Sequence, residues 1–464
     1  MRRAAFASLA VLTALAVGCG GDDDDGGGGG ASGSGETLTV WNNEFQPDRM
    51  EATQAILDDF TEKTGIKTKQ VAVPEDQLPT LMTNAAAAGE LPDVVLATPL
   101  QQSQQYAAEE IFDSEAAQAV IDNLGADTFS ENAIKLVSKD DLATGVPSDG
   151  WGQLLIYRKD VFDKAGLEAP QTLDDVTNAA KQLNGKDDMV GITLATAAGD
   201  GFTAETFEHV ALANGCQMVN DAGDVTFDSP ECAETLRWYG DLASNYSVEG
   251  AQDVDSTRGT YFAGRAAMMF WSPFLLDGMA GLRADTKPSC KECKKDPAFL
   301  AKNSGLVGPL TGSGGEPSQF GQVSTFNISV DAPTEDAQAL VEFMMNEGYT
   351  RWLALSPQGK YPVRFGDSED PEKIKTAWAE LESGVDKKAP LSESYSEESI
   401  ASLGSGVENF ERWGFAQGQG PLMGALGGEQ PVANAVADVI GGKDPAEAAK
   451  DVQATAEELQ AGLQ

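Results

Sequence analysis

After the N-terminal region, the chain alternates between strand and helix patterns for about sixty residues. Residues 37–41 alternate polar and apolar side chains, which is typical of a half-buried strand. Residues 50–64 carry apolar side chains at helical spacing and are followed by Gly65, a C-cap residue. The predicted order is strand 37–41, helix 50–64, strand 66–73, helix 78–88 and strand 94–97. This order indicates a parallel sheet that is covered by helices.

A second region of strands and helices follows residue 147, and the chain then becomes mostly helical. The second region is predicted to contain strand 153–157, helix 172–183, strand 191–195, and a helix end that runs into a buried strand over 259–271. After Pro333 the predicted helices are 335–347, 371–382, 396–410 and 445–463. The chain has 464 residues, which is too long for one ordinary core. We therefore expect an α/β protein with two lobes and a helical C-terminal part.

The N-terminus has the pattern of an export signal. Arg2 and Arg3 supply positive charge, and residues 4–17 are apolar and uncharged. This run is shorter than the roughly 20 residues that span a bilayer, so it is not expected to be a stable membrane anchor. Residues 1–18 are therefore predicted to be a signal peptide.

The end of this segment indicates a lipid anchor. Residues 15–19 resemble a bacterial lipobox, in which the cysteine, here Cys19, is diacylated and becomes the first residue. Ala16 stands where the lipobox usually has Leu, and an ordinary secretory signal with an unrelated cysteine is the alternative. Residues 20–35 are Gly, Asp and Ser with one Ala, a composition that forms flexible tethers. We expect an exported protein with a lipidated tether over 19–35, held at the outer face of the cytoplasmic membrane, in the periplasm or on the cell surface.

The formal net charge is −41, from 32 basic and 73 acidic side chains. A charge of this size repels nucleic acid and anionic membrane surfaces. We therefore expect no nucleic-acid partner, and contact with the membrane through the N-terminal lipid alone. The acidity itself serves mainly solubility.

Four further cysteines fit an oxidising compartment. The pairs favoured by the sequence are Cys216 with Cys232 and Cys290 with Cys293. A zinc site is the alternative, but there is a single C-x-x-C, and His209 is the one histidine of the chain. A redox role for the C-x-x-C segment is a further alternative, although this Lys-rich segment has the composition of a surface loop.

Catalytic signatures are missing from the sequence. There is no G-x-S-x-G elbow, no P-loop and no H-E-x-x-H motif. His209 falls in a helical pattern and is interpreted as structural. Carboxylate pairs for glycoside hydrolysis leave no sequence pattern that would reveal them. We expect no enzyme activity, no metal and no cofactor.

Several short segments occur in the order of one known family. They are 56–60 with 63–66, 88–95 (AGELPDVV), 145–147 (GVP), 155–162 (LIYRKDVF), 165–167 (AGL), 262–268 (FAGRAAM), 308–310 (GPL) and 324–329 (STFNIS). From about residue 38 to its end, the chain thereby resembles family 1 of the bacterial extracellular solute-binding proteins, the group that includes maltose-binding protein. Arg158 departs from the family, many of whose members carry Asn at this position.

The resemblance implies a type II periplasmic-binding-protein fold, in which two α/β lobes are joined by crossing strands. The N-lobe is expected to comprise 36–146 and 304–348, and the C-lobe 147–303 and 349–464. A ligand that touches both lobes binds the closed form better and shifts the open–closed equilibrium toward it.

The same resemblance implies candidate ligand-binding residues in the cleft between the lobes. Sugars present apolar ring faces and hydroxyl groups, which suit aromatic and polar side chains. The candidates are Asn43 and Glu44 after the first strand, Thr98 after the strand at 94–97, Trp151 in the crossing segment, Phe202 and Thr203 in the loop after 191–195, Trp271 and Phe274 after 262–268, and Trp413 and Phe415 in the late helical part.

The expected function is that of a monomeric receptor of an ABC importer. It would bind a small solute, most simply a mono- or oligosaccharide, and deliver it to the permease subunits. A polyamine or another small solute is the alternative ligand. A secreted glycan-acting enzyme and a surface adhesin are alternatives of other classes.

Overall fold

The structure is a computed structural model, and it describes residues 37–139 and 141–463. The predicted signal peptide at 1–18, the predicted lipidation site Cys19 and the predicted tether at 20–35 lie outside the described residues. Among the helices that are described, none contains an apolar stretch long enough to cross a membrane.

The main sheet begins with three parallel strands. β1 (Thr37–Asn42) pairs with β2 (Lys67–Ala72) on one side and with β3 (Val94–Pro99) on the other. Leu38 and Val40 of β1 are fully buried, because alternate residues of a strand face the same side of a sheet. The parallel sheet predicted from the hydrophobic pattern is confirmed.

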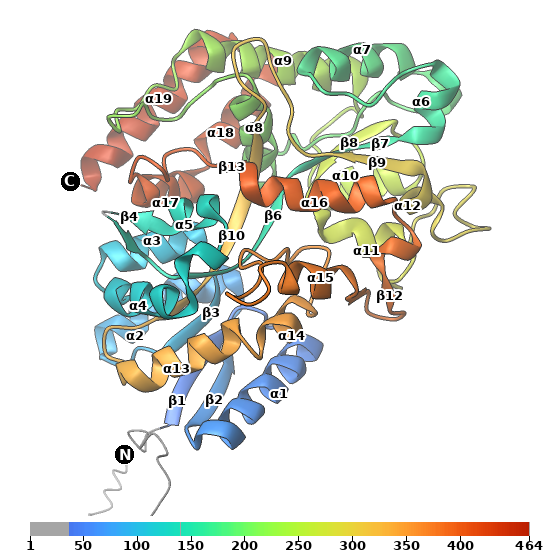
Figure 1. Cartoon of the computed structure of the whole chain (residues 1–464). Helices are drawn as coiled ribbons and strands as arrows, with labels where there is room; N and C mark the ends of the chain where they lie inside the picture. The colour runs from blue at the N-terminus through green and yellow to red at the C-terminus, as the bar shows by residue number, and fades with distance from the viewer. Residues whose placement is uncertain (1–36, 140, 464) are drawn as a thin grey trace, which may run out of the picture. The chain divides into compact units, whose positions relative to one another are not determined.

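A long strand carries this sheet toward the second half of the molecule. β10 (Gln319–Ile328) lies antiparallel between β3 and β6 (Val146–Gly152), and β13 (Phe410–Glu411) pairs with its first residues. In the described chain the strand order is β13-β10-β3-β1-β2, with β6 beside β10. Figure 1 shows β6 and β10 running between the sheet of β1–β3 and the elements drawn above it.

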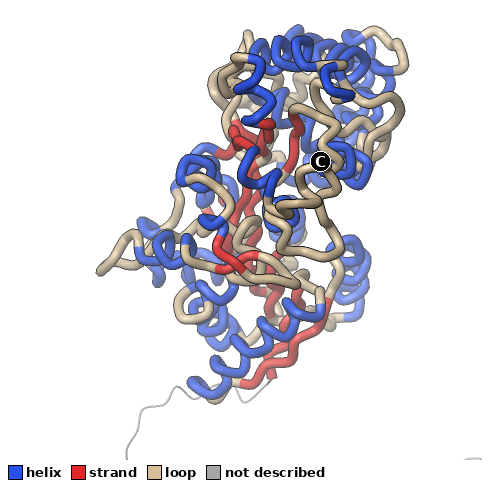
Figure 2. Tube along the Cα trace, turned by 90° about the vertical axis from the view of Figure 1, so that its right-hand side faces the viewer, coloured by secondary structure: helices blue, strands red, loops and turns tan. Residues whose placement is uncertain are grey.

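Helices flank the strands on both sides (Figure 2). α1 (Pro47–Thr64) has proline in its first turn, buries Ile56, Leu57 and Phe60, and ends at Gly65, whose φ is 79°. The other helical elements of this lobe and of the chain after β10 are η1 (Glu75–Gln77), α2 (Leu78–Ala88), α3 (Leu100–Ala108), α4 (Ser114–Leu124), η2 (Ala126–Thr128), α5 (Glu131–Val137), α13 (Thr334–Met345), α14 (Tyr349–Leu353) and α15 (Lys373–Ala379).

The second lobe is built on a smaller antiparallel sheet. β7 (Leu154–Arg158) comes almost directly after β6 and pairs with β8 (Met268–Trp271) and β9 (Ser304–Val307). Its helical elements are α6 (Lys159–Ala165), α7 (Leu173–Leu183), η3 (Lys186–Asp188), α8 (Gly201–Ala213), α9 (Pro230–Tyr246), α10 (Val254–Phe262), η4 (Pro273–Leu275), α11 (Leu276–Met279) and α12 (Phe299–Asn303).

The C-terminal part is helical, as predicted. Its elements are η5 (Leu391–Glu393), α16 (Glu397–Asn409), α17 (Gly420–Glu429), α18 (Pro431–Ile440) and α19 (Pro445–Gly462). Two-residue strands complete the structure: β4 (Ser138–Lys139) with β5 (Leu142–Ala143), and β11 (Glu382–Ser383) with β12 (Ala389–Pro390). α18 and α19 pack against α9 and against each other.

Two disulfides are formed in the second lobe. Cys216 after α8 is bonded to Cys232 in α9, and Cys290 is bonded to Cys293 within one tight segment. All four cysteines are buried. The first bond therefore ties the end of α8 to the first turn of α9.

The structure differs from one of the sequence expectations. Residues 191–195, predicted to be a strand, make only isolated bridges, such as the one between Thr193 and Met269. α14 packs against α1, α13 and α15. The lobe boundaries, including the one at 348/349, remain predictions.

A buried asparagine joins three segments where β10 crosses. Asn327 is fully buried, and its Nδ2 donates to Ser103 Oγ at 2.9 Å and to the Thr144 carbonyl at 2.8 Å. Its Oδ1 accepts from Thr325 Oγ1 at 2.7 Å. Because every polar atom of this amide has a partner, the network costs little to bury and holds β10 in one register.

We expect Asn327→Asp to lower the free energy of unfolding at pH 7 by about 2–4 kcal/mol, since the carboxylate cannot donate these bonds and is buried as a charge. Urea unfolding measures the change, which should shrink toward pH 4 as the acid becomes protonated. Asn123→Asp is the control, because the Asn123 side chain is exposed and donates to Glu342 at the surface. Equal losses in the two variants would contradict this account of Asn327.

Candidate functional site

Two pockets lie next to each other where the lobes meet. The first-lobe pocket, about 380 Å³, is lined by the loop after β1, the end of β3, and residues of β6 and β10. The second-lobe pocket, about 550 Å³, is lined by α8, β8, η4, α10 and residues 283–286. Glu205 and Phe274 line both pockets. The two pockets therefore form one cleft, with walls from both lobes.

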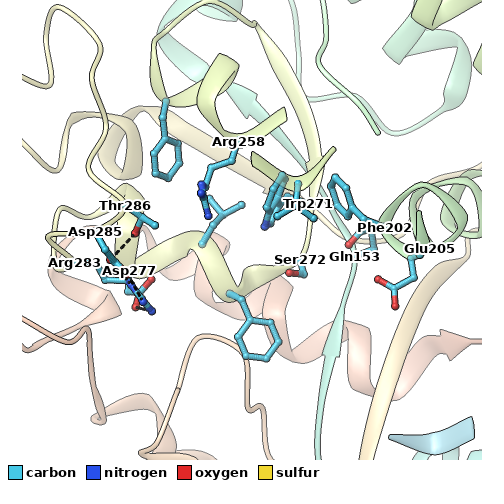
Figure 3. A pocket seen from close by; sticks show the side chains of 15 residues that line it. Gln153, Phe202, Glu205, Arg258, Trp271, Ser272, Asp277, Arg283, Asp285 and Thr286 are labelled. Carbon is cyan, nitrogen blue, oxygen red and sulfur yellow. Dashed lines mark hydrogen bonds and ion pairs between the residues drawn. The ribbon is translucent and has the colours of Figure 1, made fainter. Parts of the chain in front are cut away.

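Aromatic rings form much of the cleft wall. The rings of Phe202 and Trp271 pack with centroids 4.6 Å apart, and Figure 3 shows them side by side in the second-lobe pocket. Trp151 packs edge-on against Phe274 at 6.0 Å. A Cβ at Gly359 would overlap the Phe274 ring, so glycine is required for this close approach. Flat apolar surfaces of this kind suit the ring faces of a sugar.

A buried ion network forms the floor of the first-lobe pocket. Lys360 Nζ lies 2.5 Å from Glu44 Oε1 and 3.2 Å from Asp149 Oδ1, and its side chain is 2% exposed. Arg49 also pairs with Glu44. Burial alone raises the pKa of Glu44, but the charges of Lys360 and Arg49 outweigh it and lower the pKa to about 2. Glu44 is therefore ionised at every physiological pH.

Local structure places Glu44 and its neighbour Asn43 at this floor. The side chain of Asn42 accepts the Glu44 backbone N–H at 3.0 Å, which turns the chain where β1 ends. Asn43 Nδ2 donates to the Ala97 carbonyl at 3.1 Å, while its buried Oδ1 accepts no hydrogen bond from the described residues. Ala97 has a φ of 58°, a left-handed conformation that costs roughly 1–2 kcal/mol for a residue other than glycine. The Asn43 oxygen is therefore a buried acceptor at the edge of the pocket that has no partner among the described residues.

Charged side chains border the other end of the second-lobe pocket. Arg283 makes two hydrogen bonds to Asp285, at 3.1 and 2.9 Å, and lies 3.7 Å from Asp277 (Figure 3). Burial raises the pKa of Asp277, which the charge of Arg283 partly offsets. Arg258 pairs with Asp255 at 2.6 Å. Each cation at this end therefore already faces a carboxylate.

Glu205 lies at the junction of the pockets. It also lines a third pocket, the side pocket of about 150 Å³, together with Glu208, Arg412 and Trp413. Its pKa is raised to about 7, mainly by burial. The charges of Glu208, Glu75 and Asp200 add to this rise, and the charge of Arg412 opposes it. No hydrogen bond or ion pair of Glu205 is formed with the other described residues.

Six of the ten predicted ligand-binding residues line the cleft. These are Asn43, Glu44 and Trp151 in the first-lobe pocket, Phe202 and Trp271 in the second-lobe pocket, and Phe274 in both. Some elements differ from the expectation: Phe202 and Thr203 lie in the first turn of α8 and not in a loop, and Trp271 ends the strand β8 instead of following it.

The other four candidates lie apart from these two pockets. Thr98 and Thr203 are fully buried, and Phe415 is 1% exposed with its ring 5.0 Å from the Arg412 guanidinium. Trp413 borders the side pocket, but its indole N–H donates to the Cys216 carbonyl at 2.8 Å within the second-lobe core. We therefore expect Trp413→Ala to act on stability more than on ligand binding.

Sequence reasoning missed most of the charged side chains of the cleft. Lys360, Arg258, Asp277 and Arg283 lie on segments that carry no motif, far apart along the chain. Glu205 follows Phe202 by three residues, so it shares a helix face with a predicted candidate. Helical spacing from Phe202 was therefore the signal that could have revealed Glu205.

His209 is a structural residue of α8. It is fully buried, and its Nδ1 accepts the Phe320 backbone N–H of β10 at 3.2 Å. Burial lowers its pKa to about 3, so the ring stays neutral. Among the described residues, no cluster of three or more His, Cys, Asp or Glu side chains is placed to hold a metal ion.

Comparison with known proteins places the chain among transport receptors. The sequence pattern of the family described as bacterial extracellular solute-binding proteins matches residues 46–351. An Escherichia coli (strain K12) protein with the name "Putative ABC transporter periplasmic-binding protein YcjN" is 30% identical over 313 residues, which are 65% of this chain and 67% of that protein.

Solved structures agree with this match at the level of the fold. An ABC transporter solute-binding protein from Thermotoga lettingae, bound with alpha-D-tagatose, has a TM-score of 0.67 at 20% identity, covering 91% of this chain and 99% of that one. Maltose-bound MalE3 of T. maritima has a TM-score of 0.67 at 19% identity, with the same coverage. The chain has the mixed α/β periplasmic-binding-protein fold that the sequence predicted.

We expect Glu44→Gln to lower the free energy of unfolding at pH 7 by about 3 kcal/mol, because Lys360 stays buried with one of its two carboxylates removed. Chemical unfolding followed by circular dichroism measures this. Glu347→Gln is the matched control, since Glu347 pairs with Lys63 at the surface with more than half of each side chain exposed. The control should change by less than about 1 kcal/mol. Equal effects would contradict the assignment of Lys360 as a buried ion that depends on Glu44.

Proposed function

The chain belongs to the bacterial extracellular solute-binding protein family, and on that premise we propose that it binds a mono- or oligosaccharide in the cleft between its lobes. Members of this family are binding proteins of ABC transporters, so the chain is a solute-binding protein and not an enzyme. The identity of the solute is the proposed part.

The observation that carries the sugar proposal is the combination of aromatic and polar side chains in the cleft. Trp271 and Phe202 offer ring faces from the second lobe, and Trp151 offers one from the crossing strand β6. Asn43 and Gln153 add amide groups beside them. Flat apolar surfaces with a few hydrogen-bonding groups fit a ring with hydroxyl substituents. The tagatose and maltose of the two compared structures are in keeping with this class of ligand.

Binding would act on the equilibrium between open and closed lobes. A solute held by Trp151 and Asn43 on one side and by Trp271 on the other gains contacts that a single lobe cannot provide. Such a ligand stabilises the closed form by its difference in affinity for the two forms. β6 and β10 connect the lobes and are the segments in which bending would occur.

We further propose that the loaded receptor delivers its solute to the permease of an ABC importer, and that it is anchored by the lipidated Cys19. Replacing Cys19 by Ala should move the protein from the membrane fraction of expressing cells to the soluble exported fraction. Retention of the variant in the membrane fraction would argue against the anchor.

A thermal-shift screen of sugars and polyamines identifies the ligand class. A true ligand at 100 times its Kd should stabilise the protein by about 2.7 kcal/mol. A shift from spermidine or putrescine with none from any sugar would overturn the sugar proposal.

For the sugar with the largest shift, we expect Trp271→Ala and Trp151→Ala to weaken binding by about ten- to a hundredfold, because each removes a buried aromatic contact. Isothermal titration calorimetry measures the Kd. Trp238→Ala is the control, since Trp238 lies on α9 outside the cleft and its indole donates to Thr177. Unchanged affinity in both cleft variants would refute the assignment of the site.

A further inference from the structure

One carboxylate of the cleft lacks the partners that its neighbours have. Glu44 and Asp149 share Lys360, Asp277 and Asp285 face Arg283, and Glu208 accepts from Arg412 at 3.1 Å. Glu205 has no such bond within the described structure, although it lines all three pockets. Glu205 is therefore a carboxylate of the cleft that is left for a ligand.

The charges around Glu205 are mostly of its own sign. Arg412 is the nearby cation, and its guanidinium is already bonded to Glu208 and, at 2.6 Å, to Gln322 Oε1. The negative charge of Glu205 is repelled by three other carboxylates: Glu208 on the same helix, Asp200 at the N-cap of that helix and Glu75 from the first lobe. These groups and Arg412 together leave a net negative charge where the pockets join.

Closing the lobes over a neutral sugar would remove water from this uncompensated carboxylate. A buried charge without a partner is costly, and it is relieved either by a proton or by a cation of the ligand. Phe202 lies one helical turn before Glu205, and Trp271 packs on Phe202 (Figure 3). A carboxylate beside aromatic faces is a suitable environment for an ammonium group.

Resting on the proposed sugar-binding function, we propose that the solute is an amino sugar, whose protonated amine pairs with Glu205 while its ring lies on the aromatic wall of Phe202 and Trp271. The hydroxyl groups of the sugar then face the polar side chains of the first-lobe pocket. The proposal accounts for a junction that is negatively charged although Glu44, Asp149, Asp277 and Asp285 are each paired with a cation.

The test compares sugars that differ only in the amine. Glucosamine, galactosamine and the β-1,4-linked disaccharide of glucosamine are titrated calorimetrically beside their N-acetylated forms and beside glucose, galactose and maltose. We expect at least one amino sugar to bind about tenfold or more tightly than its N-acetylated form at pH 7.

Binding of the amino sugar should weaken by about tenfold between pH 7 and pH 5.5. Glu205, with a pKa of about 7, becomes almost fully protonated over this range, whereas the amine is mostly protonated throughout it. Binding of a neutral sugar should not weaken in this way.

The matched variant is Glu205→Gln, which keeps the shape of the side chain and removes its charge. It should lose the preference for the amine and the pH dependence, while its melting temperature at pH 7 stays equal or rises. Glu249→Gln, an exposed carboxylate outside the cleft-lining residues, should behave as the parent protein.

The outcomes separate this inference from the function on which it rests. Binding of neutral sugars without any preference for an amine overturns the amino-sugar assignment and leaves the sugar receptor standing. A preference for the amine that survives in Glu205→Gln overturns the role of Glu205. Binding of a polyamine with no binding of any sugar overturns both proposals.

Discussion

Lys360 is the buried cation on which the geometry of the site depends. An ammonium group with 2% of its side chain exposed costs several kcal/mol unless carboxylates surround it. Two carboxylates pair with this ammonium group: Glu44, just after β1, and Asp149 in β6. The Trp352 indole N–H donates to Asp149 at 2.9 Å, and the Trp352 ring lies 4.5 Å from the Lys360 ammonium. Three segments that are distant in sequence are thereby joined at one point. Because Trp151 lies two residues after Asp149 in β6, these contacts of Asp149 also fix the position of Trp151 in the cleft.

The joint also connects the first lobe to the second. The ring of Phe274, in η4 of the second lobe, packs directly against Gly359, the residue before Lys360. β6 runs from the ion network toward β7, and β10 pairs with β6 along the same crossing. A ligand between Trp151 and Trp271 therefore lies between two surfaces whose separation depends on these strands. Glu205 lines both pockets where they meet, and we propose that the charge of a ligand there affects the closing of the lobes.

Much of this architecture could be predicted from the sequence. The parallel strands β1–β3, α1 with Gly65, and the C-terminal helices follow from local periodicity and capping, which neighbouring residues encode. Residues 191–195 have the composition of a strand but make only isolated bridges, because pairing depends on distant segments. The resemblance to a family led to six aromatic and polar residues that line the cleft, and their role in binding remains a prediction. Lys360 and Glu205 were missed, since a charged side chain reveals its role only when the residues that face it are known.

We propose that one solute is held between the two lobes at the junction marked by Glu205. A crystal structure with the most strongly stabilising sugar tests this proposal. We expect the sugar to contact Trp151 or Asn43 of the first-lobe pocket and Trp271 of the second-lobe pocket at the same time, with a nitrogen within hydrogen-bonding distance of Glu205. A sugar bound to one lobe alone, or outside these pockets, would contradict it.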